Sequence, residues 1–170
     1  MFKRIAFILG FYVLVSAFAV AQTDTEPTTP LSEEVQRAYF QATQHLIKGD
    51  LDKAYSSFTF CSDEERKVSA FHFELGKIDL QLSRFESSLM HFDNAIKLDY
   101  ENSWYFYYRA QTLLSLEDYD SAWLDLIEWV KVRPGDLEAL EECSESFLRA
   151  GQTWHAFQLL SYYEDMVVKN

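Results

Sequence analysis

The chain is poor in the residues from which catalytic and metal sites are usually built. It has five glycines, two cysteines and four histidines in 170 residues. So few glycines leave little material for a phosphate-binding loop, and the motifs GxxxxGK[ST], GxSxG, HExxH and CxxC do not occur. Metal binding and acid–base catalysis both need converging side chains, whereas the histidines are scattered. We therefore expect no enzyme, no cofactor and no metal site; without a DxDxDG loop, calcium binding has no support either.

Basic residues are also scarce relative to acidic ones. The sequence contains 15 Lys and Arg against 27 Asp and Glu, which gives a formal net charge of −12. This charge repels nucleic acid and anionic membrane surfaces, so neither is expected as a partner. Ordinary solubility accounts for most of the acidic excess.

Only the N-terminus carries a long apolar run. Lys3 and Arg4 precede apolar residues up to Val20, and Ala19-Val20-Ala21 has the small-residue pattern of a cleavage site. This layout predicts a signal peptide at 1–21 and therefore export, with the periplasm favoured over secretion. The alternative, a retained transmembrane helix, needs roughly 20 apolar residues, and this run is shorter. A lipid anchor is not expected because no cysteine follows the run directly. No stable membrane anchor should remain after cleavage.

Residues 22–34 carry almost no apolar weight and are predicted to be a flexible leader, followed by one domain at 35–170. A 34-residue offset divides this domain into segments 35–68, 69–102, 103–136 and 137–170. Two positions of each segment hold only small residues, namely Ala42, Gly76, Ala110 and Ser144 at one and Ala54, Ser88, Ala122 and Ala156 at the other. Antiparallel helices approach closely only where both side chains are small, so each segment is predicted to be helix, turn, helix.

Local signals agree with this division. Ser32 and Asn102 are suited to cap helices, and Pro134-Gly135-Asp136 is suited to separate two of them. Ser62 with Glu65 has the form of a capping box, which predicts that the second hairpin begins soon after the first ends.

The repeated segments resemble the tetratricopeptide repeat (TPR) family. The resemblance rests on Leu75-Gly76, on the alanines Ala54, Ala122 and Ala156, on the aromatic residues Phe58 and Phe92, and on Pro134. It implies an all-α, right-handed superhelix of four hairpins, in which the first helix of each hairpin lines the inner, concave surface and binds protein. It also places Cys61 and Cys143 in hairpins one and four, which should not touch. We therefore expect two buried free thiols rather than a disulfide.

The first helices carry the candidate binding residues. Tyr39, Phe73, Tyr107 and Glu141 share one column of the repeat, and Trp104, Tyr107 and Tyr108 share one helix face. Gln111 is a further candidate groove residue on the same helix. Glu138, Glu141 and Glu145 extend this surface as an acidic stripe. These residues predict a groove for a peptide or helix with apolar or aromatic anchors and basic residues. The alternatives are that the rings belong to the core and that the glutamates are only a solvated face.

Two further expectations follow from the resemblance. The Lys, Asn and Arg residues with which some family members grip an acidic chaperone tail are absent, since the corresponding positions include Gln36, Phe40 and Tyr108. The last hairpin has no following helix, yet it carries Phe157, Leu160, Tyr163, Met166 and Val167. This apolar surface suggests self-association, and it supports an alternative function as a structural subunit of a cell-envelope assembly.

Overall fold

The computed structural model describes residues 30–169, so the predicted signal peptide and most of the predicted leader lie outside the described part of the chain. The described part consists of eight α-helices and contains no strand. In chain order they are α2 (Glu33–Lys48), α3 (Leu51–Glu64), α4 (Ser69–Gln81), α5 (Phe85–Leu98), α6 (Ser103–Ser115), α7 (Tyr119–Val132), α8 (Leu137–Arg149) and α9 (Thr153–Lys169).

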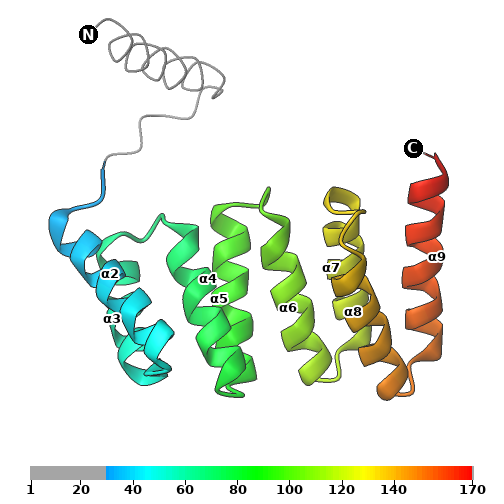
Figure 1. The fold of residues 1–170 in the computed structure, drawn as a ribbon, viewed down its shortest axis with the longest axis horizontal. Coiled ribbons are helices and arrows are strands. Elements are labelled where there is room, and N and C mark those ends of the chain that lie inside the picture. The colour runs from blue at the N-terminus through cyan, green and yellow to red at the C-terminus, as the bar shows by residue number, and fades with distance from the viewer. Residues whose placement is uncertain (1–29, 170) are drawn as a thin grey trace, which may run out of the picture. The chain divides into compact units, whose positions relative to one another are not determined.

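The helices pack as successive hairpins. Contacts join α2 to α3, α4 to α5, α6 to α7 and α8 to α9, and each of the first two hairpins also packs through its second helix on the next first helix. The hairpins therefore follow one another as a row from α2 to α9 (Figure 1). This arrangement confirms the predicted all-α hairpin solenoid.

Caps and turns set the ends of the helices. The backbone N–H of Val35 donates to Ser32 Oγ at 3.2 Å, and that of Trp104 donates to Asn102 Oδ1 at 3.2 Å, which confirms both predicted caps. The turns inside the hairpins each contain a left-handed residue at intervals of 34, namely Gly49, Ser83, Glu117 and Gly151. Two of these residues are not glycine, so the hairpin geometry outweighs a local cost of about 1 kcal/mol or more.

Ser62 does not cap a helix, because it lies inside α3. The second hairpin does begin soon after the first, as predicted, since α3 ends at Glu64 and α4 begins at Ser69. The Ser62 hydroxyl lies 3.4 Å from His72 Nε2, so it joins α3 to α4 rather than opening a new helix.

Small residues form the close contacts between the paired helices. All eight members of the two small-residue columns are buried. A Cβ atom added to Gly76 would lie 2.7 Å from the Phe92 ring, which shows how closely α4 and α5 approach. Cys61 and Cys143 are buried and free, as expected. No helix within residues 30–169 combines the length and apolar character needed to span a bilayer.

Candidate protein-binding face

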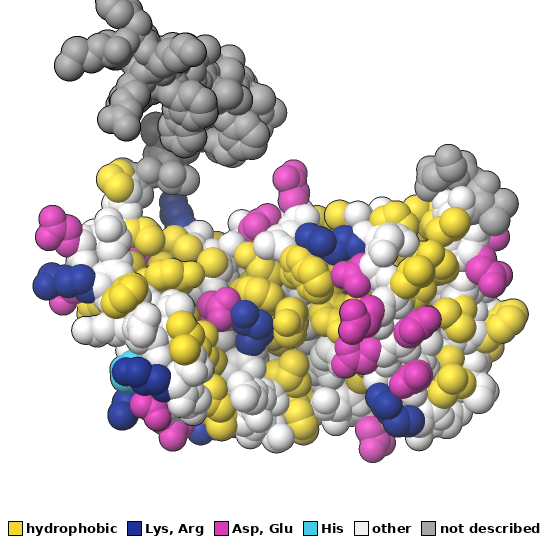
Figure 2. All heavy atoms as spheres, viewed as in Figure 1, with side chains coloured by type: hydrophobic (Ala, Val, Ile, Leu, Met, Phe, Trp, Pro, Cys, Tyr) yellow, Lys and Arg dark blue, Asp and Glu magenta, His cyan; other side chains and the backbone are white. Residues whose placement is uncertain are grey.

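Figure 2 shows hydrophobic side chains gathered over the middle of one face, around α4 and α6, and acidic side chains beside them over α8. These are first helices of their hairpins, on which the sequence predicts the binding residues. We call Phe73, Trp104, Glu138, Glu141, Glu142 and Glu145 the acidic–aromatic face.

An aromatic cluster connects α4, α6 and α7. The Phe73 ring lies 5.2 Å from that of Tyr108, and the Trp104 ring lies 6.5 Å from Tyr108 and 5.6 Å from Tyr107. Tyr107 in turn lies 5.2 Å from Trp129, which is fully buried. Phe73 and Trp104 are half-buried, so the cluster belongs partly to the core and partly to the surface. Tyr107 therefore belongs to the core, whereas Phe73 and Trp104 are accessible and stay candidate binding residues.

The two half-buried rings each lie against a cation of the protein itself. Lys77 Nζ is 4.7 Å from the centre of the Phe73 ring, and the Arg133 guanidinium is 4.5 Å from that of Trp104. Such contacts at exposed sites are worth about 0.5–1 kcal/mol. Since both cations are on long side chains, a partner group could displace them at small cost.

Tyr107 links the aromatic cluster to the acidic residues. It is buried, and its hydroxyl donates to Glu142 Oε2 at 3.0 Å. Burial raises the pKa of Tyr107 well above its ordinary value, with Cys143 and Glu142 acting in the same direction. Tyr107 therefore stays a neutral donor that supports the face from beneath, rather than an exposed anchor.

Gln111 also lies close to α8. Its side-chain amide donates to Cys143 Sγ at 3.5 Å. Burial raises the pKa of the Cys143 thiol to about 12, so this sulfur stays protonated at neutral pH. Gln111 thus helps to join α6 to α8 in the layer below the surface glutamates.

The remaining predicted residues are exposed. Glu138, Glu141 and Glu145 all reach solvent on α8, and Glu145 forms an i,i+4 ion pair with Arg149 at 3.5 Å. Tyr39 is 44% exposed and packs its ring within the first two hairpins, 5.8 Å from Phe58 and 6.0 Å from Phe71. The structure thus joins Phe73, Trp104 and Tyr107 in one aromatic cluster through Tyr108. Tyr107 and Gln111 link this cluster to Glu142 and Cys143 of α8. Tyr39 packs in another part of the row.

Sequence reasoning missed the two cations. Lys77 could have been found, because it follows Phe73 by four residues on one helix and therefore shares its face. Arg133 could not be found locally, since it follows α7 and reaches Trp104 only through the packing of the third hairpin.

A second polar cluster lies where α3, α4 and α5 meet. His72 Nδ1 and His91 Nδ1 are 3.3 Å apart, and His91 Nε2 lies 3.3 Å from the Tyr55 hydroxyl and 3.7 Å from Asp79 Oδ2. Burial lowers the pKa of both imidazoles, although Asp63 opposes this for His72 and Asp79 opposes it for His91. Within the part of the chain described here, no group of three or more His, Cys, Asp or Glu side chains could hold a metal ion.

Solved structures similar to this one are TPR proteins. The crystal structure of MamA matches with a TM-score of 0.67 and 14% identity, over 80% of this chain and 81% of that chain. The first TPR of Spaghetti (RPAP3), bound to the HSP90 peptide SRMEEVD, matches with a TM-score of 0.66 and 15% identity, over 71% and 95%. A tetratricopeptide repeat protein from Parabacteroides merdae matches with a TM-score of 0.66 and 18% identity, over 82% and 56%.

Comparison at the level of sequence finds no relative of this chain. The chain matches no protein-family model and no curated protein sequence. At identities of 14–18% the structural similarity concerns the fold alone. That fold is the helix-turn-helix solenoid of TPR proteins.

Proposed function

We propose that this protein is an exported, non-enzymatic adaptor that binds a peptide or helix of another protein on its acidic–aromatic face. The observation that carries the proposal is the hydrogen bond from Tyr107 to Glu142, which joins the aromatic cluster to the acidic side chains of α8. One segment of a partner could therefore contact rings and carboxylates together. The proposed compartment is the periplasm, and it rests on the N-terminal sequence pattern.

The charge of this face selects the chemistry of the partner. The exposed carboxylates of Glu138, Glu141, Glu142 and Glu145 attract Lys and Arg, while Phe73 and Trp104 offer apolar contact. We therefore propose a segment with an aromatic or aliphatic anchor followed by basic residues. The TPR of RPAP3 is bound to an acidic peptide, SRMEEVD. A peptide of that charge would be repelled by α8 in this protein.

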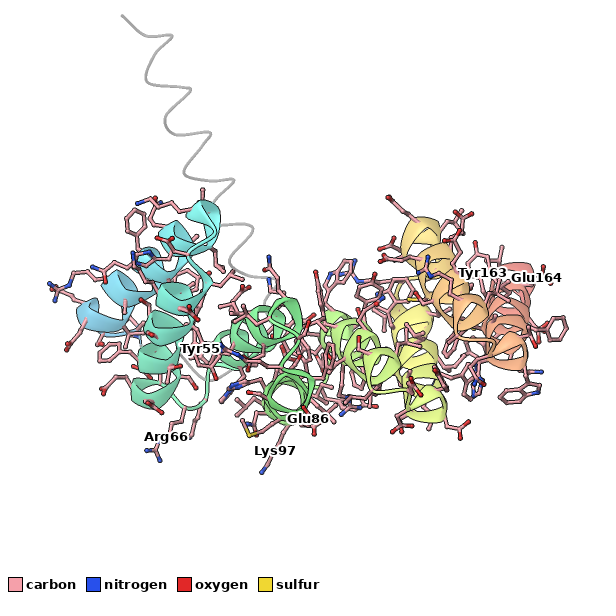
Figure 3. All side chains as sticks on the ribbon, turned by 90° about the horizontal axis from the view of Figure 1, so that it is seen from below. Tyr55, Arg66, Glu86, Lys97, Tyr163 and Glu164 are labelled. Atoms are coloured by element: carbon pink, nitrogen blue, oxygen red, sulfur yellow. The ribbon has the colours of Figure 1, made fainter. Side chains whose placement is uncertain are left out.

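The test is to select peptides from a random display library on the purified protein. Enrichment of sequences that pair an apolar anchor with Lys or Arg is the expected result. Glu138→Lys/Glu141→Lys should abolish binding of these peptides, because the new lysines repel their basic residues. The variant should fold, because both residues are exposed and the core is unchanged. Glu86→Lys is the matched control, since Glu86 is exposed on α5 at the edge from which Arg66 and Lys97 also project (Figure 3). Selection of acidic peptides, or equal loss in the control, would refute the proposal.

A second candidate function is favoured by the exposure of large apolar residues on α9, where Trp154 is 57% and Phe157 is 66% exposed. In this alternative the protein is a structural subunit of a cell-envelope assembly and its last hairpin makes the main contacts. The two functions are separable, because substitutions on α9 would then matter more than substitutions on α8.

A further inference from the structure

The outer side of α9 lacks the cover that equivalent positions have elsewhere in the row. Leu160 is 39% exposed, although the residues 34, 68 and 102 positions earlier are almost fully buried. These residues are Leu126 (0%), Phe92 (0%) and Phe58 (1%). Phe92, for example, lies 6.1 Å from the ring of Tyr108 on α6, the first helix of the next hairpin. Leu160 occupies a position built to be covered, and no described helix lies beyond α9 (Figure 1).

Two neighbours of Leu160 enlarge this uncovered surface. Phe157 is 66% exposed, whereas its equivalents Tyr55, Leu89 and Trp123 are half-buried. Trp154 is 57% exposed and stands where the other hairpins carry an exposed carboxylate, which is Asp52, Glu86 or Asp120. Replacing an acid by tryptophan at an exposed position extends the apolar surface. We call Trp154, Phe157 and Leu160 the terminal face.

The opposite end of the row is finished differently. On α2, Arg37 and Gln41 are exposed at positions equivalent to the buried Phe71 and Leu75 of α4. The shallow hollow at this end is lined by Glu34, Arg37, Ala38, Gln41, Ser56, Ser57 and Phe60. This end mixes the polar side chains of Arg37 and Gln41 with the ring of Phe40, which is 65% exposed. Head-to-tail stacking of copies would bury the charged Arg37 side chain against the uncharged terminal face, which disfavours that arrangement.

The charge distribution allows two terminal faces to meet. Residues 153–163 contain no Asp, Glu, Lys or Arg, although the chain carries 27 acidic residues in all. The nearby carboxylate of Asp120 lies within hydrogen-bond distance of His155 Nε2, at 2.9 Å. Glu164 lies with Tyr163 at this end of the row (Figure 3), one helical turn after Leu160 and two turns after Phe157. Two copies can thus bring their terminal faces together without opposing like charges at the centre of the contact.

We propose that the terminal face binds the same face of a second copy, giving a closed two-fold dimer through α9. The dimer covers Leu160 as the next hairpin covers its equivalents, and it leaves the acidic–aromatic face on α4, α6 and α8 to its own partner. This proposal does not rest on the function proposed for that face. The two can therefore fail independently.

The test is sedimentation of the purified full chain over a range of concentrations. A monomer–dimer equilibrium with no larger species is expected. Trp154→Glu should raise the dimer dissociation constant at least about 30-fold, as the loss of a buried aromatic anchor does. This variant should fold, because the other three hairpins carry an acid at that position. Phe157→Glu should act in the same way.

Met90→Glu is the matched control, since Met90 is 53% exposed on α5, away from the last hairpin. Its dimer should persist. A wild-type protein that is monomeric at about 100 μM overturns the proposal, because even a weak specific interface would be occupied there. Species larger than the dimer would overturn the two-fold arrangement. Dimers that survive in both α9 variants would also refute it.

Discussion

Gly76 offers the sharpest test of how closely the hairpins pack. A Cβ atom at this position would lie 2.7, 2.9 and 2.9 Å from three atoms of the Phe92 ring. Phe92 is fully buried and has the rings of Phe73 and Tyr108 within 6.0 and 6.1 Å, so it has little room to retreat. Gly76→Ala should therefore strain the core, even though alanine is the better helix former.

The two effects differ enough to predict the sign. Overpacking of a well-packed core costs about 1–3 kcal/mol, and the upper part of this range applies because three ring atoms are involved. Replacing glycine by alanine inside a helix returns about 1 kcal/mol. The expected net loss is about 2 kcal/mol in the free energy of unfolding. In urea denaturation followed by circular dichroism, this should lower the midpoint by roughly 1 M.

Two further variants make the reasoning refutable. Gly135→Ala should change stability by less than about 0.5 kcal/mol, because a Cβ atom there meets nothing within 4 Å. Adding Phe92→Leu to Gly76→Ala recreates the pair Ala110 and Leu126 of the third hairpin and should recover part of the loss. The reasoning is refuted if Gly76→Ala stabilises the protein. It is also refuted if the double variant loses as much stability as the two single variants together, because the contact between Gly76 and Phe92 would then not be the reason for glycine.

Two other predictions concern buried charge. Arg109→Ala should cost about 3 kcal/mol in urea denaturation, because it removes two 2.7 Å hydrogen bonds from the buried carboxylate of Asp125; the double variant Arg109→Ala/Asp125→Ala should lose less. The pKa values of His72 and His91 are lowered in the folded protein, so on acidification the unfolded chain takes up these protons first. The contribution of the two neutral imidazoles to the free energy of unfolding is therefore complete above pH 6.5. It is lost as the pH falls through the lowered pKa values of the folded protein. The urea midpoint should therefore fall on acidification, and His72→Gln/His91→Gln should flatten that fall.

Much of the fold could be predicted because each position at a helix contact occurs four times, once in every 34-residue segment. Gly76 alone is ambiguous, but together with Ala42 and Ala110 at the same offset it predicts a close helix contact. The same repetition explains why Ser83 and Glu117 adopt a left-handed conformation without being glycine. Their turns must match those at Gly49 and Gly151, since the packed helices on either side set the geometry.

The candidate site was less predictable, because spacing on one helix does not say what covers it. Trp104 and Tyr107 share a face of α6, yet Tyr107 is buried beneath α7 and α8 whereas Trp104 stays half-buried. Trp129 of α7 lies near both rings, whereas Glu142 of α8 forms a hydrogen bond with Tyr107. Ser62 shows the same limit. Its spacing from Glu65 is typical of a helix cap, but in the folded chain its hydroxyl lies beside His72 Nε2.

Positions that depart from the repeat therefore carry most of the information about partners. Packing between hairpins requires the same kind of residue at equivalent positions of the repeat. Where one hairpin carries a different kind of residue and still folds, packing does not explain the exchange. At Glu141 an acid replaces the aromatic residues of the first three hairpins, and at Trp154 an aromatic residue replaces three acids. The two exchanges run in opposite directions in one hairpin, so a general acidic bias cannot explain both. The two contacts proposed above, a charged one on α8 and an apolar one on α9, would account for both exchanges.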